Sequence, residues 1–324
     1  MALPIYATPL ERIWYYAFRV ICALVFLFLV APILIVIPLS FNVEPYFSFT
    51  QKMLTLDPTG YSLRWYDTLL TLGVNLPEDA VRDASWWQQM WAEATWIKAA
   101  RNSLWIGLWA TVLATVLGTT AALGLSRPEM PYRRVIMALL ISPMIVPIII
   151  IGTGLFFFYS SACLSPENPL GWLLSPFLSV KGCLANSHLG IILAHATLGI
   201  PFVIITVTAT LSGFDQSLIR ASASLGANPR TTFFKVIMPL ILPGVISGAL
   251  FAFVTSFDEV VAVLFIAGPD QQTIPRQMWN GIREAISPAI LAVATILVIV
   301  SITLLATVEL LRRRSERLRG VTPG

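Results

Sequence analysis

Residues 215–243 read DQSLIRASASLGANPRTTFFKVIMPLILP and form a polar island between two long apolar runs. The pattern predicts two short helices. The first covers residues 217–225 and stops at Gly226, and the second runs from about residue 231 towards Pro239, with Asn228 as N-cap. Helix–turn–helix units of soluble proteins read DNA, but the membrane-length runs on both sides of this unit argue against that role.

The composition of the whole chain indicates a polytopic membrane protein. Of the 324 residues, 56% are hydrophobic and 12% are charged, whereas soluble domains are about a quarter charged. The three cysteines and two histidines lack the spacing of a zinc site, so we expect no metal. No lysine follows a glycine, so the chain lacks a P-loop, and any ATP that drives it is hydrolysed by another chain.

Six apolar runs are long enough to cross a bilayer, which needs roughly 20 residues. They cover residues 20–39, 103–125, 135–159, 189–211, 241–267 and 286–308. We therefore predict an all-α fold with six transmembrane helices. The first run is too long for a typical signal peptide and lacks a small-x-small exit, which favours an uncleaved span.

The distribution of charge predicts the orientation of these spans. The N-terminus, the loops 126–134 and 212–240 and the C-terminal tail hold 13 Lys/Arg and 5 Asp/Glu, whereas the opposite side holds 8 and 10. Cytoplasmic loops carry the excess of basic residues, so both termini are predicted to be cytoplasmic. Segment 40–101 and loop 160–187 are then external. The basic tail, residues 312–324, is expected to lie near anionic lipid rather than on nucleic acid.

The polar island also resembles the cytoplasmic coupling loop of ABC-importer permeases, whose motif is E-A-A-x3-G-x9-I-x-L-P. The matching positions are Arg220, Ala221, Ser222, Gly226, Val236, Met238 and Pro239. In that family the loop docks into a cleft of the ATPase subunit. Arg220 departs from the pattern, because the family usually carries Glu there.

Three further stretches are similar to the permeases of spermidine/putrescine importers. The first combines PLSFN (38–42) with GYSLRWYDTLL (60–70), and the second is RNSLWIGLWATVLATVLGTTAALGLSR (101–127). The third combines TSFDEVVAVLFIAGP (255–269) with TIPRQMWNGIREAISP (273–288). The resemblance implies a type I ABC importer permease domain over residues 20–311, in the bacterial inner membrane. It also implies a second permease chain, two ATPase subunits that use ATP, a periplasmic solute-binding protein and a polyamine or related small cationic solute.

Helical geometry divides the fifth run into faces. At 100° per residue, the small residues Gly244, Gly248, Ala252 and Ser256 form one stripe. A second face is polar and aromatic and is a candidate solute pathway; it consists of Ser247, Phe251, Thr255 and Asp258. Glu259 projects onto the small stripe and is predicted to be a structural intramembrane charge. The alternative is that both carboxylates are structural, each satisfied by a helix end or an arginine.

Features outside the motifs leave alternatives open. Pro143 and Pro147 should kink the third run. Cys163 and Cys183 lie in an external loop, where a disulfide and two free thiols both fit the sequence. The histidines at 188 and 195 are expected to serve helix packing.

Two different classes of protein remain as alternatives to the permease. A self-sufficient secondary transporter or channel would work without an ATPase, and a scaffolding membrane protein would not respond to solute. Within the ABC class, the solute could instead be an amino acid derivative or another small organic molecule.

Overall fold

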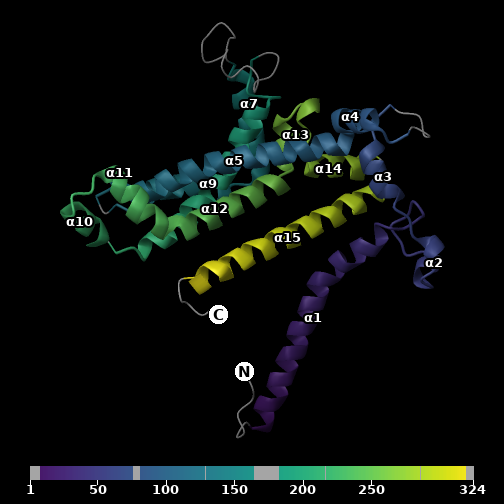
Figure 1. Cartoon of the computed structure of the whole chain (residues 1–324), viewed down its shortest axis with the longest axis horizontal. Coiled ribbons are helices and arrows are strands. Elements are labelled where there is room, and N and C mark those ends of the chain that lie inside the picture. Colours follow the sequence, from purple (N-terminus) through teal and green to yellow (C-terminus); the bar gives the residue numbers. More distant parts are fainter. Residues whose placement is uncertain are drawn as a thin grey trace. The chain divides into compact units, whose positions relative to one another are not determined.

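The computed structural model describes residues 8–75, 81–127, 129–163, 182–215, 217–284 and 286–318. Its regular elements are helices, accompanied by isolated β-bridges at Asn42–Tyr61 and Cys163–Cys183, so the all-α prediction is confirmed. The chain forms two compact units, residues 1–90 with 281–324 and residues 91–280. Figure 1 shows the helices of both units.

The elements divide between the two units. Those that lie in or begin in the first unit are α1 (Pro9–Leu39), α2 (Gln51–Leu54), η1 (Pro58–Gly60), α3 (Arg64–Thr71), α4 (Ala84–Glu93) and α15 (Ala289–Leu318). Those that begin in the second unit are α5 (Thr95–Leu125), α6 (Arg133–Ile145), α7 (Ile148–Ser161), α9 (His188–Ser212), α10 (Ser217–Ser224), α11 (Pro229–Thr232), η3 (Phe233–Ile237), α12 (Met238–Asp258), α13 (Val261–Ile266), η4 (Pro269–Gln271) and α14 (Ile274–Glu284).

In the first unit, PLSFN (38–42) and GYSLRWYDTLL (60–70), which together resemble the start of polyamine permeases, contact each other. The Trp65 indole N–H donates to the Asn42 carbonyl oxygen at 2.7 Å, and the hydroxyls of Ser40 and Tyr66 lie 2.7 Å apart. Asn42 is fully buried, and its side-chain amide donates to the carbonyl oxygens of Tyr46 and Ser48. The residues of PLSFN and GYSLRWYDTLL thus brace the segment that follows the first span.

In the second unit, α5, α9 and α12 run side by side (Figure 1). Small residues line the buried face of α5: Gly107, Ala110, Ala114, Gly118 and Ala122. Such residues let helices approach closely in lipid, where packing rather than water drives association. This three-helix core carries the candidate site.

Most of the predicted spans coincide with long apolar helices. In the part of the chain that the structure describes, four single helices are long and apolar enough to cross a membrane: α1, α5, α9 and the continuous run Pro229–Asp258. Within the described residues, Ala289–Thr303 of α15 is a shorter apolar helix. Of the predicted tail 312–324, the structure describes the helical backbone to Leu318 and no side chain.

The third predicted span is broken rather than kinked. The α6 and α7 axes differ in direction by 101° across a break between Ile145 and Ile148. Pro147 lies in the break, and Val146 before it is extended, at ψ 135°, as a residue before proline prefers. The expectation of one kinked helix over residues 135–159 is therefore wrong.

The fifth predicted span, residues 241–267, also differs from expectation. Its helix starts earlier, because α11, the π-helical segment η3 and α12 form one helical run of 30 residues from Pro229 to Asp258. It also ends earlier, because the backbone of Glu259 is extended, at ψ 121°. A separate short helix, α13, follows. The second helix of the polar island is therefore the beginning of the fifth span.

Candidate functional site

The small-residue face of α12 is buried against α9 and α5. Its members are Gly244, Gly248, Ala252 and Ser256, as predicted. A Cβ atom on Gly248 would lie 2.8 Å from the Val203 Cα atom of α9, closer than two carbon atoms pack. The α9 backbone therefore approaches α12 at a distance that requires glycine there, and this contact places the small-residue face of α12 against α9.

The predicted solute pathway lies on a face of α12 that the chain itself leaves largely uncovered. Ser247, Phe251 and Asp258 are exposed, and Thr255 is half-buried. The Phe251 ring stacks on Phe202 of α9, with ring centroids 6.1 Å apart. These four residues follow one another along the helix towards its C-terminal end. Their role in transport stays a prediction.

Asp258 is the last residue of α12, so its carboxylate lies where the helix carries its partial negative charge. The final carbonyl groups of a helix lack intrahelical partners, and the last turn here contains no basic residue. A carboxylate at this end is unfavourable by itself. The helix end thus has the electrostatic character of a site for a positive charge.

Glu259 has a different position from the one that helical geometry predicted. It leaves the helix, and its Oε1 atom accepts a hydrogen bond of 2.9 Å from the Ala262 backbone N–H. The side chain therefore caps the first turn of α13. The prediction placed Glu259 within a helix that continues to residue 267, whereas α12 ends at Asp258. Its role as a structural intramembrane charge stays a prediction.

His195 of α9 is a buried polar residue beside this helix end. Its Nδ1 atom lies 2.8 Å from the Ser256 hydroxyl oxygen of α12. Its Nε2 atom is buried and meets no hydrogen-bond partner among the described residues. The expectation that His195 serves helix packing did not foresee this contact, which depends on the register of two helices.

The polar island forms a compact turn between α10 and α11. Gly226 has φ +77°, in the left-handed region that only glycine and a few other residues adopt readily. The Asn228 side-chain oxygen accepts a hydrogen bond of 2.8 Å from the Thr231 backbone N–H. Both features agree with the predicted helix stop and N-cap.

The residues of the coupling motif divide into a buried and an exposed set. The Ser222 hydroxyl is buried and lies 3.0 Å from that of Thr232, which ties α10 to α11. Arg220, Ala221 and Pro239 are exposed. This arrangement leaves Arg220, Ala221 and Pro239 accessible to another protein.

Arg220 lies near one acidic group of the same turn. Hydrogen bonds from the Ser217 hydroxyl and backbone N–H lower the pKa of Asp215, and attraction to Arg220 adds to the effect. Asp215 is fully exposed and sits just before α10. The surface around Arg220 is therefore of mixed charge.

Several exposed apolar residues on the coupling loop were not singled out from the sequence. Leu225 is 88% exposed, and Leu218 and Phe234 are exposed as well. Large apolar side chains on a polar loop suggest contact with a partner. Their presence inside an otherwise polar stretch was the signal that could have identified them.

An open depression of about 480 Å³ lies near residues 120–130, lined by Thr120, Leu123, Gly124, Arg127, Glu129 and Met130. The α5 helix runs antiparallel to α12, because Gly107 of α5 faces Ser256 and Ala122 packs near Ile241. The depression is therefore at the end of the core opposite to Asp258. It does not belong to the candidate solute pathway.

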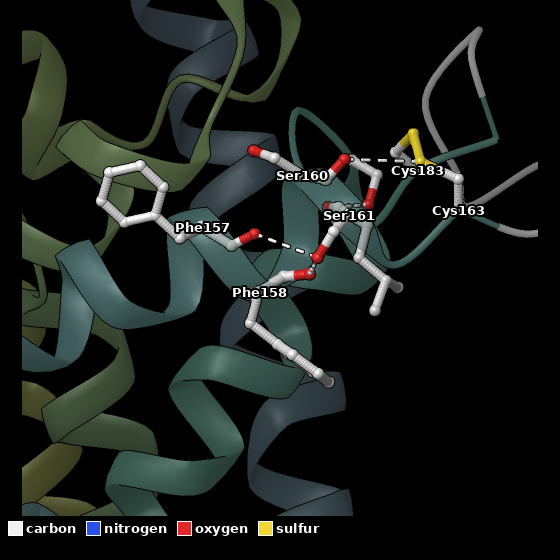
Figure 2. Close-up of a disulfide and its surroundings, with 8 residues drawn as sticks. Phe157, Phe158, Ser160, Ser161, Cys163 and Cys183 are labelled. Atoms are coloured by element: carbon white, nitrogen blue, oxygen red, sulfur yellow. Dashed lines mark hydrogen bonds between the residues drawn. A yellow bond between two sulfur atoms is a disulfide. The ribbon is translucent and has the colours of Figure 1, made fainter.

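Cys163 and Cys183 are joined by a disulfide that closes the segment between α7 and α9 (Figure 2). In Figure 2 this bond lies just beyond the last turn of α7, where the Ser161 hydroxyl donates to the Phe158 carbonyl oxygen at 2.9 Å. Residues 164–181 of the predicted external loop lie outside the described part. The remaining cysteine, Cys22, is free and exposed on α1.

Comparison with known proteins assigns a family to this architecture. The family model described as "Binding-protein-dependent transport system inner membrane component" matches residues 114–317, which is more than half of the chain. The chain belongs to this family. The members of the family are transport permeases, so the predicted class of ABC-importer permease, a transport subunit rather than an enzyme, is confirmed.

Relatives within the family share most of the chain. The spermidine/putrescine transport system permease protein PotC of Haemophilus influenzae is 27% identical over 292 residues, which cover 90% of this chain and 95% of PotC. The putrescine transport system permease protein PotI of Escherichia coli K12 is 29% identical, with 93% of each chain covered. The molybdenum transport system permease protein ModB of Mycobacterium bovis is 29% identical over 66% of this chain and 80% of its own.

A solved structure supports the permease fold. A bacterial ABC transporter involved in the import of the acidic polysaccharide alginate superimposes with a TM-score of 0.60 and covers 96% of this chain and 99% of its own. The two sequences are 16% identical, so the likeness concerns the fold alone. The type I permease fold predicted from the sequence is therefore confirmed, and the individual site residues are untested by any of these comparisons.

Proposed function

We propose that this permease forms part of the solute pathway of an ATP-driven importer for small cationic solutes of the polyamine type. It would work with a second permease chain, two ATPase subunits and a solute-binding protein on the outside. The relatives PotC and PotI, whose names give spermidine and putrescine as solutes, each match at least 90% of the chain and support this solute class.

The position of Asp258 is the observation that supports a cationic solute. Its carboxylate is exposed at an uncapped, electronegative helix end, and exposed Phe251 lies on the same face two turns earlier. An acidic group attracts an ammonium, and an aromatic face adds cation–π attraction. An anionic solute would be repelled by the same groups, which argues against a molybdenum-type oxyanion as in the name of ModB.

The coupling to ATP hydrolysis would pass through residues 217–239. Arg220, Ala221, Leu225 and Pro239 are exposed and available for an ATPase surface. The helical run that begins at Pro229 continues to Asp258 over 30 residues, about 45 Å at 1.5 Å per residue. A displacement of the coupling loop would therefore be carried along one helix to the proposed solute site.

Reconstitution of the full complex tests this function. The permease is purified together with the transport proteins encoded beside it and placed in proteoliposomes, and ATP hydrolysis is measured with the binding protein and putrescine, spermidine, molybdate or a neutral amino acid. We expect stimulation by the polyamines. Stimulation by molybdate alone would overturn the solute class, and uptake without any ATPase subunit would favour a secondary transporter.

A further inference from the structure

In the described chain, the C-terminal end of α12 lacks a capping interaction from its own residues. The Glu259 backbone turns away from the helix, and the described residues provide no capping hydrogen bond from its N–H group. The last turn also carries Asp258, whose negative charge opposes the helix dipole there. Helix ends without caps fray, so the position of Asp258 depends on the contacts that the last turn of α12 and the following helix α13 make with neighbouring helices.

The polar contact of the last turn of α12 with α9 is the hydrogen bond between His195 and Ser256. Ser256 belongs to the last turn of α12, two residues before Asp258, and its hydroxyl oxygen is 2.8 Å from the His195 Nδ1 atom. His195 is only 1% exposed. The α5 helix closes over the pair, because a Cβ on Gly107 would lie 3.9 Å from the same hydroxyl oxygen. Three spans thus meet at this one polar contact.

The surroundings of the pair are otherwise apolar. One buried cluster contains Ile191, Ala194 and Leu198 of α9 with Ile106 of α5, and a second contains Ala196 and Ala252. A hydrogen bond in such surroundings has no competition from water and is directional, whereas apolar packing permits small rotations. The bond therefore fixes the rotation and height of the last turn of α12 relative to α9.

We infer that His195 is a positioning residue of the solute site, which holds Asp258 in place for the cation through its hydrogen bond to Ser256. This inference rests on the proposed function of Asp258. It assigns a role in solute affinity to a buried residue that touches no solute. Among the described residues, the Nδ1 contact with Ser256 is the hydrogen bond that the ring makes, because Nε2 meets no partner there.

Two substitutions whose amide groups lie at different distances from the backbone distinguish the role of the hydrogen bond from the role of side-chain volume. In His195→Asn the amide lies at the distance of Nδ1 and can still bind Ser256, whereas in His195→Gln it reaches towards the unpartnered Nε2 side. His195→Leu removes the bond and keeps the volume. His195→Leu combined with Ser256→Ala removes both partners, which can be nearly neutral for stability. His188→Leu, seven residues earlier on α9, is the matched control.

The assay is uptake of radiolabelled putrescine by the complete complex as a function of its concentration, with the yield of assembled complex measured in parallel. We expect His195→Leu, His195→Gln and the double variant to raise the half-saturating concentration about two- to tenfold, the range of one net hydrogen bond, at unchanged yield. His195→Asn and His188→Leu should remain within about twofold of wild type.

Other outcomes overturn the inference. An unchanged half-saturating concentration in His195→Leu, a loss of yield alone, or equal behaviour of the Asn and Gln variants would each make His195 a purely structural residue. In an Asp258→Asn background the His195→Leu change should have no further effect on half-saturation, because its effect acts through Asp258. A full additional effect there would also contradict the inference.

Failure of the proposed function is distinguishable from failure of this inference. If Asp258→Asn alone leaves putrescine uptake unchanged, the function proposed for Asp258 is wrong, and the positioning role of His195 is overturned with it. If Asp258→Asn impairs uptake but His195→Leu does not, the proposed function stands and only the positioning role is wrong.

Discussion

Replacing Gly226 should separate ATPase docking from insertion of the permease into the membrane. Its φ is +77°, and a Cβ there would meet nothing within 4 Å, so backbone strain is the main cost of a substitution. That strain is about 1–2 kcal/mol for an ordinary residue and greater for a β-branched one. The turn is held by the Ser222–Thr232 hydrogen bond, worth about 0.5–1.5 kcal/mol, and the Asn228 cap, worth about 1 kcal/mol. Strain of comparable size should displace the turn in most Gly226→Val molecules.

The assay is capture of the ATPase by affinity-tagged permease from solubilised membranes, together with uptake. We expect Gly226→Val to insert normally but to capture about tenfold less ATPase, the factor that corresponds to 1.4 kcal/mol. Gly226→Asn is the matched control, because asparagine tolerates the left-handed conformation, and it should stay within about twofold of wild type. Normal capture and uptake by Gly226→Val, or an equal loss in Gly226→Asn, would refute the reasoning.

Three further predictions concern other parts of the chain. Gly248→Ala should lower the stability of the solubilised permease by about 1–3 kcal/mol through overpacking against Val203, whereas Gly154→Ala, with open space within 4 Å, should be nearly neutral; equal unfolding midpoints in detergent would contradict the close approach of α9 and α12. Alkylation of the unreduced, denatured permease followed by intact mass should label Cys22 alone, because a disulfide across about 20 residues stabilises its loop by roughly 3 kcal/mol; labels on Cys163 and Cys183 would show free thiols. Arg220→Glu should weaken capture of the native ATPase, which we expect to present an acidic or neutral surface there, and stronger capture would indicate an ordinary basic cleft.

Features determined by local chemistry were predictable from the sequence. Gly226 ends a helix because of its backbone freedom, and Asn228 begins one because its side chain accepts a hydrogen bond from a free N–H; both were placed correctly. The small-residue face of α12 followed from helical periodicity. The buried side of α12, from Gly244 to Ser256, agrees with that prediction residue by residue.

Features that depend on distant parts of the chain were not predictable. The residues around the break after Asp258, FDEVV (257–261), include neither proline nor glycine, so no residue type there indicates that a helix ends. The break accompanies the packing of α13 against α7 and the cap that Glu259 provides. Similarly, the two prolines of the third span signalled a bend, but its 101° angle did not follow from them. The contact of His195 with Ser256 required the register of α9 against α12.

The central claim is that Asp258 meets a cationic solute, and uptake of radiolabelled putrescine by the complete complex with Asp258→Asn tests it most directly. Asp270→Asn, at an exposed aspartate outside the spans, is the matched control, and Asp258→Glu keeps the charge. We predict that Asp258→Asn impairs uptake while assembly and basal ATP hydrolysis persist, that Asp258→Glu retains part of the activity, and that Asp270→Asn behaves as wild type. Unchanged uptake by Asp258→Asn would contradict the claim.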